Sequence, residues 1–314
     1  MKMEKQTSGF SNGNLIISGE YFVLAGAKAL AVPLKFGQSM KVDYFSNNQN
    51  IILWKSSELG KPWFNAELDC EHLTIISSSN SLIALKLQKL LKAIHRIKPE
   101  FFDKNKSYLI SSDIQFNLNW GWGSSSTLVS NLATWAGIDP FELNQMVSSG
   151  SGYDIAASLS PTPVFYQVSN ETRSIEPVVF NPLFKGSILF IYLGRKQSSE
   201  SSIEKNLASV RKNKNLIPLI NELTEKFATE KNIQEFERSI AEHEKIVSGT
   251  IKTTRIREKY FNDFEGEIKS LGAWGGDFAM AVSQLDRIRV IKYFREKKLE
   301  TIFGFDEIIK SNLI

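Results

Sequence analysis

The stretch "NWGWGSSST", Asn119 to Thr127, lies between an alternating polar and apolar run, "LISSDIQFNLN", and an apolar-periodic segment, "TLVSNLATWAGI". A glycine-rich turn that runs directly into a helix leaves backbone N–H groups without partners and directs the positive end of the helix dipole at one point. Gly121 and Gly123 let the backbone approach a ligand closely, and Ser124, Ser125 and Ser126 add hydroxyl groups. The stretch predicts a phosphate-binding loop or, in the simpler alternative, a serine-capped helix after a tight turn.

Two tryptophans, Trp120 and Trp122, interrupt these small residues, and no lysine follows the second glycine as a Walker loop requires. The ring of Trp122 could stack on a nucleotide base or fill space beside the loop. We expect filling, because a large apolar ring beside glycines more often packs than recognises a ligand. Trp274 interrupts a later glycine loop in the same manner, so we expect both rings to belong to one modified cleft.

Composition limits the classes of protein to consider. The chain has 314 residues, a net charge of +4 and a single cysteine, Cys70, which excludes an internal disulfide and fits a reducing cytoplasm. Its basic residues are spread out, so we expect no nucleic-acid partner. No apolar run approaches the roughly 20 residues that span a bilayer, and the first residues lack a signal-peptide core. We therefore expect a soluble, cytoplasmic protein without a membrane partner.

The pattern of elements predicts an α+β chain in two lobes, 1–170 and 171–314. Residues 14–45 are typical of short strands joined by glycine turns, and residues 160–178 of a polar, proline-containing linker. Apolar spacing predicts a helix over 81–97, capped by Ser79 or Asn80, and another over 140–147, with Asp139 as its cap. Further helices are expected at 124–136, 199–212, 215–229, 232–259 and 286–299, and strands at 107–118, 186–194, on both sides of the loop in 271–283, and at 301–309.

Three stretches together resemble the motifs of the GHMP kinases, the superfamily of galactokinase, homoserine kinase, mevalonate kinase and phosphomevalonate kinase. "GWGSSST" resembles the second motif, with Trp122 in place of leucine and Asn117 in place of the usual proline. "GNLIISGEYFVLAGAKALAVPL" looks like the first motif and "LGAWGGDFAMAV" like the third. Their order and spacing cover almost the whole chain. The resemblance implies a ribosomal-protein-like N-terminal lobe, a ferredoxin-like C-terminal lobe and an ATP-dependent phosphotransferase.

The resemblance also implies residue roles. The cofactors would be ATP and Mg²⁺, with the ATP phosphates held by the loop residues Asn119, Gly121, Trp122, Gly123, Ser124, Ser125 and Ser126. In "GSGYDIAAS", Asp154 matches the carboxylate that faces the acceptor oxygen, although such an aspartate can also be a simple helix cap. Ser125 matches the metal-contacting serine, and Glu142 is the nearest candidate for the second ligand, or else an ordinary exposed first-turn glutamate.

One departure concerns the mechanism. Mevalonate and phosphomevalonate kinases usually carry a lysine where this chain has Asn14, so another cation, such as Lys28, Arg195 or Lys196, would have to stabilise the reacting oxygens. If no other cation takes this role, we expect a lower turnover rate or an altered function.

The acceptor is expected to be 5-phosphomevalonate, with mevalonate as the alternative. Tyr21 in "GEY", Asp277 in "GGD" and the loop "LGRKQSSESS" resemble phosphomevalonate kinases more than mevalonate kinases. A third possibility is a ligand-binding protein that has lost turnover. In each case we expect a monomer or a homodimer. The expected substrate-binding residues are Asn14, Glu20, Tyr21, Arg195, Lys196, Ser198, Ser199, Gly275, Gly276 and Asp277. The histidines His72, His95 and His243 show no motif context and are expected at surface or satisfied helix positions.

Overall fold

The computed structural model describes residues 3–46, 49–103, 105–169, 172–194, 199–274 and 276–311. Contacts between Cα atoms divide the chain into two compact units that interleave along the sequence. The first unit consists of Met1–Gly13, Phe36–Leu118 and Gly123–Leu159, and the second of Asn14–Lys35, Asn119–Trp122 and Ser160–Ile314. The expected lobes, 1–170 and 171–314, stay a prediction.

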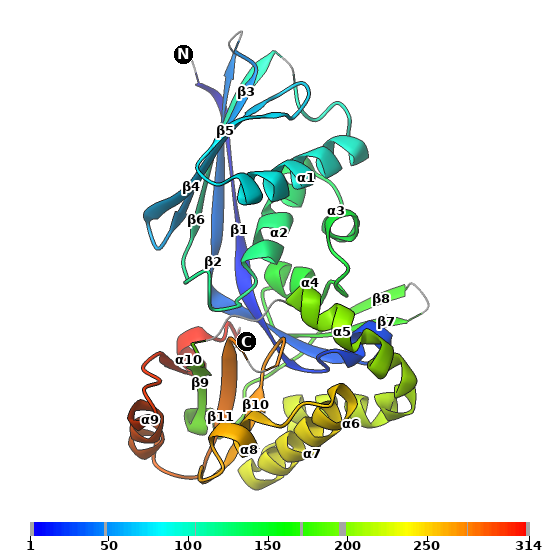
Figure 1. The fold of residues 1–314 in the computed structure, drawn as a ribbon, viewed down its shortest axis with the longest axis vertical. Coiled ribbons are helices and arrows are strands. Elements are labelled where there is room, and N and C mark those ends of the chain that lie inside the picture. Colours follow the sequence, from blue (N-terminus) through cyan, green and yellow to red (C-terminus); the bar gives the residue numbers. More distant parts are fainter. Residues whose placement is uncertain are drawn as a thin grey trace. The chain divides into compact units, whose positions relative to one another are not determined.

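The first unit packs helices on one face of a sheet (Figure 1). Its strand order is β5-β4-β3-β6-β2, and β1 also pairs with β2. The apolar core lies between this sheet and the helices, with Ile52 and Ile110 on strands opposite Leu91 and Leu132 on helices. The elements are β1 (Met3–Ser18), β2 (Ala29–Ser46), β3 (Ile51–Glu58), β4 (Lys61–Asp69), β5 (Ile75–Ser78), α1 (Ser81–Ile97), β6 (Lys106–Ile114), α2 (Ser124–Ala136), α3 (Pro140–Val147) and α4 (Tyr153–Leu159), with the end of β1 and the start of β2 belonging to the second unit.

The second unit contains an antiparallel sheet of order β10-β11-β9-β12, and one of its faces packs against α8 and α9 through Ile256 and Phe294 (Figure 1). Helix α7 contacts α5, α6 and β10. The elements are η1 (Phe22–Ala25), β7 (Val164–Ser169), β8 (Thr172–Pro177), η2 (Lys185–Ser187), β9 (Ile188–Tyr192), α5 (Ser199–Lys212), η3 (Lys214–Leu216), α6 (Ile217–Thr229), α7 (Ile233–Ile251), α8 (Ile256–Tyr260), β10 (Glu267–Ser270), β11 (Phe278–Val282), α9 (Arg287–Glu296), β12 (Ile302–Gly304) and α10 (Phe305–Ile308).

Most predicted helices are confirmed. Helices α1, α2 and α5 have the expected bounds, and α3 begins after Asp139, whose side chain accepts a hydrogen bond from the N–H of Phe141. Asn80 rather than Ser79 caps α1, since its side chain accepts from the N–H of Ile83. No helix among the described residues is long and apolar enough to cross a bilayer.

Four predictions about elements were wrong. The N-terminal region forms two long strands, β1 and β2, instead of short ones, and its glycines serve close packing: a Cβ on Gly37 in β2 would overlap the carbonyl oxygen of Ser11 in β1. The expected linker is the β7–β8 pair. The helix expected over 232–259 is interrupted at Lys252, which has a left-handed φ of 53° and separates α7 from α8. The last expected strand is only β12, followed by α10.

Candidate functional site

The first turn of α2 is open to a ligand. Gly123 has a left-handed φ of 78° and provides no side-chain cap, whereas asparagine or aspartate side chains cap α1, α3, α7 and α9. The first N–H groups of a helix have no acceptor within the helix, and at α2 no side chain of the N-cap residue accepts from them, a start that suits an anion. Ser125 is exposed, and its hydroxyl makes no hydrogen bond within the described part of the chain. The hydroxyl of Ser126 instead donates to the carbonyl oxygen of Gly123 over 2.9 Å.

A buried polar network fixes α2 within the first unit. The Thr127 hydroxyl donates to Gln38 Oε1 over 2.6 Å, and Asn131 Nδ2 donates to the backbone oxygen of Gln38 over 2.9 Å. Gln38 Nε2 donates to the Ser112 hydroxyl over 2.6 Å, and the Ser11 hydroxyl donates to Asn131 Oδ1 over 2.9 Å. Because unpaired buried polar groups are costly, this network favours one position of α2 against β1, β2 and β6.

Asp154 lies in the first turn of α4, which packs against α2. The hydroxyls of Ser130 on α2 and Ser158 on α4 are 2.6 Å apart, which joins the two helices. The N–H of Ile155 donates to Asp154 Oδ1 over 3.1 Å, and burial raises the pKa of the Asp154 carboxyl above its ordinary value of 3.8. Asp154 makes no ion pair with any described residue, so its charge is not already neutralised by such a partner.

Glu142 lies in the first turn of α3 and is exposed. Helix α3 packs against both α2 and α4. An exposed carboxylate is available to a cation, yet the same position suits an ordinary first-turn glutamate, which the helix dipole stabilises. The metal-binding role of Glu142 stays a prediction.

In the second unit, the loop Asn119–Trp122 packs on an aromatic cluster formed by Trp120, Trp122, Phe278 and Phe303. The ring of Trp122 is fully buried, and its centroid lies 4.7 Å from that of Trp120, 5.3 Å from Phe278 and 5.4 Å from Phe303. The expectation that Trp122 fills space agrees with this packing. Asn14 is buried beside the loop and donates its backbone N–H to the carbonyl oxygen of Trp122 over 3.0 Å.

The loop between β10 and β11 approaches the same stretch. Gly121 has a left-handed φ of 67°, and a Cβ at this position would overlap Asp277 Oδ2, so only glycine fits beside this carboxylate. Asp277 itself has a positive φ of 38°, and its carbonyl oxygen accepts from the N–H of Leu193 over 2.7 Å. Burial and then the negative Asp277 raise the pKa of the Tyr192 hydroxyl. Gly276 is buried in this loop, and Gly275 lies outside the described residues.

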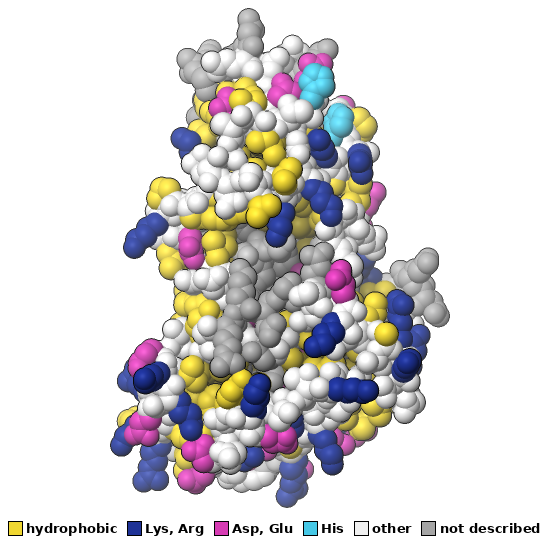
Figure 2. Space-filling view, viewed as in Figure 1, with side chains coloured by type: hydrophobic (Ala, Val, Ile, Leu, Met, Phe, Trp, Pro, Cys, Tyr) yellow, Lys and Arg dark blue, Asp and Glu magenta, His cyan; other side chains and the backbone are white. Residues whose placement is uncertain are grey.

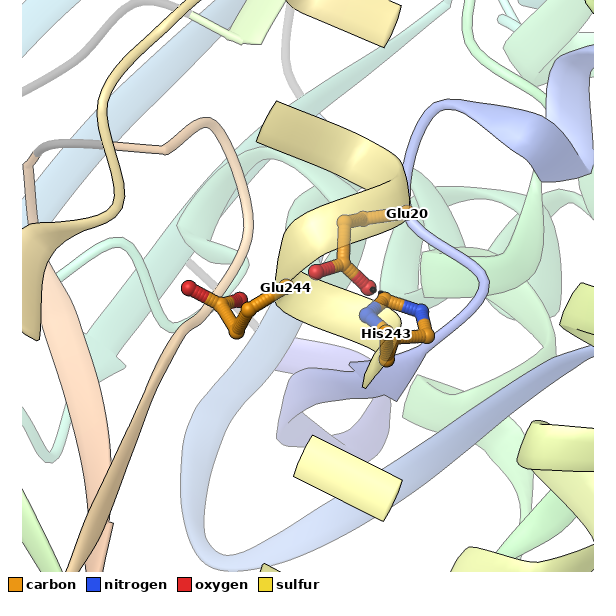
Figure 3. A group of neighbouring side chains, drawn as sticks. All are labelled: Glu20, His243 and Glu244. Carbon is orange, nitrogen blue, oxygen red and sulfur yellow. Dashed lines mark ion pairs between the residues drawn. The ribbon is translucent and has the colours of Figure 1, made fainter. Parts of the chain in front are cut away.

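Glu20, His243 and Glu244 form a buried cluster, in which Glu20 comes from the turn after β1 and the other two from α7 (Figure 3). Lys269 makes an ion pair and a short hydrogen bond with Glu20, and its Nζ lies 3.7 Å from Glu244 Oε1. Three ligand atoms within 4.8 Å of one another could hold a metal ion, but the ammonium group of Lys269 already lies beside Glu20 and Glu244. Sequence analysis missed this cluster, because no local motif links its four members.

The three titratable groups of the cluster differ in protonation, with Glu20 ionised and His243 and Glu244 mostly neutral at pH 7. Burial raises the pKa of Glu244 to about 8, so this carboxyl is mostly protonated at pH 7, and its oxygens interact with the N–H and hydroxyl of Ser270 at 3.1 and 3.2 Å. Burial also lowers the pKa of His243 to about 3, and the N–H of Gly19 donates to its Nε2 over 3.3 Å, which assigns a neutral ring. Burial opposes ionisation of Glu20, but the neighbouring Lys269 keeps its pKa below the ordinary value of 4.5.

Tyr21, which is expected to bind substrate, and Trp274 both have structural partners. Tyr21 is buried with a left-handed φ of 61°, and its hydroxyl makes hydrogen bonds with Ser202 and Asn206 of α5. Trp274 packs near Tyr21 and donates its indole N–H to Glu20 Oε1 over 3.2 Å. Trp274 therefore belongs to another hydrophobic cluster than Trp122, and the cleft expected to contain both rings stays a prediction.

The cation that would replace the family lysine is only partly described. Lys28 makes an ion pair with Glu225 and lies 5.1 Å from the centroid of the Phe165 ring, so it has partners of its own. Arg195, Lys196 and Ser198 lie outside the described residues, and Ser199 is described only as the first residue of α5. On the face drawn in Figure 2, Lys and Arg side chains are interspersed with Asp and Glu.

Comparison with solved structures identifies the fold. Mevalonate kinase of L. major in complex with R-mevalonate is 14% identical, with a TM-score of 0.67 over 99% of this chain and 98% of that one. Phosphomevalonate kinase of Streptococcus pneumoniae with phosphomevalonate and AMPPNP is 15% identical, with a TM-score of 0.68 over 95% and 98%. Galactokinase of Lactococcus lactis with galactose is 13% identical, with a TM-score of 0.69 over 96% and 93%.

The chain has the GHMP kinase fold. Its α+β class, expected from the sequence, is confirmed by these structures. No protein-family model matches the sequence, and no curated protein matches it. At 12 to 15% identity the likeness extends to the fold that kinases with different acceptors share.

The packing of Trp122 leads to a prediction. Trp122→Leu should lower the free energy of unfolding by about 2 to 3 kcal/mol, because it removes part of a fully buried ring, and should leave the dissociation constant of ATP nearly unchanged. Urea unfolding and a fluorescence titration with ATP measure the two effects. Trp120→Leu, at a partly exposed ring of the same cluster, is the matched control. A large loss of ATP affinity at unchanged stability would contradict the packing role.

The buried Glu244 predicts a pH dependence. The pKa of Glu244 is about 8 in the folded protein and about 4.5 in the unfolded chain. Between these two pH values the folded protein keeps a proton on Glu244 that the unfolded chain has released. Stability from this group is therefore complete below pH 4.5 and is lost as the pH rises towards 8, by up to about 1.4 kcal/mol per pH unit. Glu244→Gln should flatten the curve of unfolding free energy against pH over this window, while Glu242→Gln, at an exposed position of the same helix, should retain the wild-type slope. Equal slopes in all three proteins would show that Glu244 is ionised in the fold.

Proposed function

We propose that this protein is an ATP-dependent small-molecule kinase. The observation that carries the proposal is the first turn of α2, which begins at a left-handed glycine, has no side-chain cap and bears the exposed hydroxyl of Ser125. Such a turn suits the phosphates of a nucleotide, because backbone N–H groups and the helix dipole favour negative charge there. A solved kinase in complex with AMPPNP shares the fold, which supports nucleotide binding by this protein.

Asp154 would face the acceptor. Phosphoryl transfer needs an oriented nucleophile and a carboxylate that can accept its proton, and little covalent participation from the protein. Burial raises the pKa of the Asp154 carboxyl, which makes it a better proton acceptor than an exposed carboxylate. The network of Gln38, Thr127 and Asn131 would hold α2 in place, and the packing of α2 on α4 would fix Asp154 in the same unit.

The residues also fit Mg²⁺. A hydroxyl and a carboxylate are the hard oxygen ligands that this ion prefers, and it keeps several waters. Ser125 is an exposed hydroxyl at the phosphate-binding turn, and Glu142 is an exposed carboxylate on α3, which packs against α2. When bound, Mg²⁺ would neutralise part of the charge on the phosphates, while Ser125 and Glu142 would hold it.

The acceptor we propose is 5-phosphomevalonate. Tyr21 in the first motif and Asp277 in the third resemble phosphomevalonate kinases, and a solved phosphomevalonate kinase shares the fold over nearly the whole chain. The substrate residues would include Asn14, Glu20 and Tyr21, Arg195 and Lys196 with Ser198 and Ser199, and Gly275 to Asp277. Mevalonate is the second candidate, because "GSGYDIAAS" also resembles the aspartate motif of mevalonate kinases.

Release of ADP tests the acceptor. With ATP and Mg²⁺, we expect turnover of 5-phosphomevalonate and little of mevalonate or galactose. Turnover of mevalonate alone would replace the first candidate by the second. Nucleotide binding in a calorimeter, with ADP release at background for every acceptor, would instead identify a binding protein without turnover.

Asp154→Asn should reduce turnover by about 10²- to 10⁴-fold while ATP binds with nearly unchanged affinity, because the proton acceptor is lost and the phosphate loop is intact. The same substitution removes a carboxylate that is penalised by burial, so the Tm at pH 8 should stay equal or rise. A variant that retained most of its turnover would contradict the role of Asp154. Loss of turnover together with a large fall in Tm would point to a structural role.

A further inference from the structure

Helix α1 carries a row of exposed apolar and basic side chains along its outer side. Its opposite side, which includes Leu87 and Leu91, is buried in the core of the first unit. The exposed positions follow one another at spacings of three and four residues, which keep side chains on one face of a helix. They are Leu82, Leu85, Lys89, Lys92 and Arg96, with Lys86 between the first and third of them, and we call this set the α1 stripe.

The α1 stripe has an apolar end and a basic end. Leu82 and Leu85, in the first turns of the helix, are 72% and 53% exposed, which is unusual for leucine in a helix whose apolar side is already buried. The four basic residues follow them and are all exposed. Figure 2 shows Lys and Arg side chains beside apolar ones in the region where Figure 1 draws α1.

The basic residues of the α1 stripe make no ion pair with any carboxylate in the part of the chain that the structure describes. Helix α1 contains no Asp or Glu, and neither do β5 and α2, against which it packs. Helix α3 contributes only Glu142, in its first turn, whereas Lys89 Nζ donates to the backbone oxygen of Val147 at its other end over 3.1 Å. Like charges three or four positions apart on a helix repel each other, so an external anion would stabilise this face.

Three kinds of partner present negative charge, and an acidic protein helix fits the whole stripe best. A helix that lies on a membrane inserts a continuous apolar face, but the apolar face of α1 is buried in its own unit. The contacts of a protein with a nucleic-acid backbone are mainly polar and leave the two leucines without a partner surface. An amphipathic helix can pack along positions spaced by three and four residues, with apolar side chains on the leucines and carboxylates on the basic residues.

We propose that the α1 stripe is a docking surface for an acidic amphipathic helix of a partner protein. Leu82 and Leu85 would bury apolar area at one end of the contact, and the cations would attract the partner and fix its register. The surface lies entirely within the first unit, and the inference does not depend on the proposed kinase activity.

Fluorescence anisotropy with a labelled synthetic helix tests the proposal. The probe has about three heptads, with leucine at the first facing positions and glutamate at the others, and is made in both sequence directions. The wild type should bind one of the two directions at least about tenfold more tightly than the same peptide with glutamine in place of glutamate. Salt at about 0.15 M, where the Debye length is about 8 Å, should reduce this preference.

Two double variants separate the two ends of the stripe. Lys92→Glu with Arg96→Glu should weaken binding of the glutamate peptide at least about tenfold, and Leu82→Ser with Leu85→Ser should weaken it about tenfold. All four side chains are exposed, so the Tm of both variants should stay close to that of the wild type.

Lys205→Glu with Lys212→Glu is the matched control, because it makes the same change of net charge at exposed positions of another helix, α5. It should retain the wild-type affinity for the glutamate peptide. Equal binding of the glutamate and glutamine peptides, or equal weakening by the α5 variant, would overturn the proposal. Tighter binding of duplex DNA or of phosphatidylserine vesicles, lost in the Lys92 and Arg96 variant, would also overturn it, since the stripe would then recognise phosphate groups in place of an acidic helix.

Discussion

The open first turn of α2 is the constraint on which the proposed chemistry depends. A helix start without a cap is unfavourable by itself, since its N–H groups lose hydrogen bonds that a side chain would supply. Here the buried network around Gln38 holds the helix from within the first unit, through Thr127 and Asn131. Stability thus comes from groups one turn and more beyond the helix start, which leaves the first turn available for a ligand.

The second unit contains a buried ion pair between Glu20 and Lys269. Glu20 follows β1, whereas Lys269 lies in β10, and their ion pair joins segments almost 250 positions apart in the chain. A buried charge is tolerated only when it is paired, and here one lysine serves two carboxyls, of which Glu244 keeps its proton. The cluster also fixes the turn that carries Tyr21, whose positive φ is maintained by its burial and by hydrogen bonds to α5.

The sequence predicted those elements whose formation depends on neighbouring residues. The cap and apolar spacing of α1 and the Asp139 start of α3 follow from neighbours in the sequence, and both are observed. The length of β2 was missed because Gly37 looks like a turn residue, although it lies within the strand and lets β1 approach closely. The break at Lys252 has no glycine or proline to signal it, and the cluster around Lys269 depends on contacts between distant segments. The residue roles at the candidate site came from motif resemblance, and the geometry of Asp277 at Gly121 required the fold.

Large and small residues alternate in "NWGWG" because neighbouring positions meet different surroundings. Gly121 faces the Asp277 carboxylate, where a side chain would overlap, while the next residue, Trp122, is buried among Phe278 and Phe303. Phe278 follows Asp277 in the sequence, just as Trp122 follows Gly121. The pair Gly121–Trp122 therefore packs on the pair Asp277–Phe278. The alternation of size in this stretch therefore follows from two different demands, close approach at Gly121 and filling of a buried aromatic cluster at Trp122.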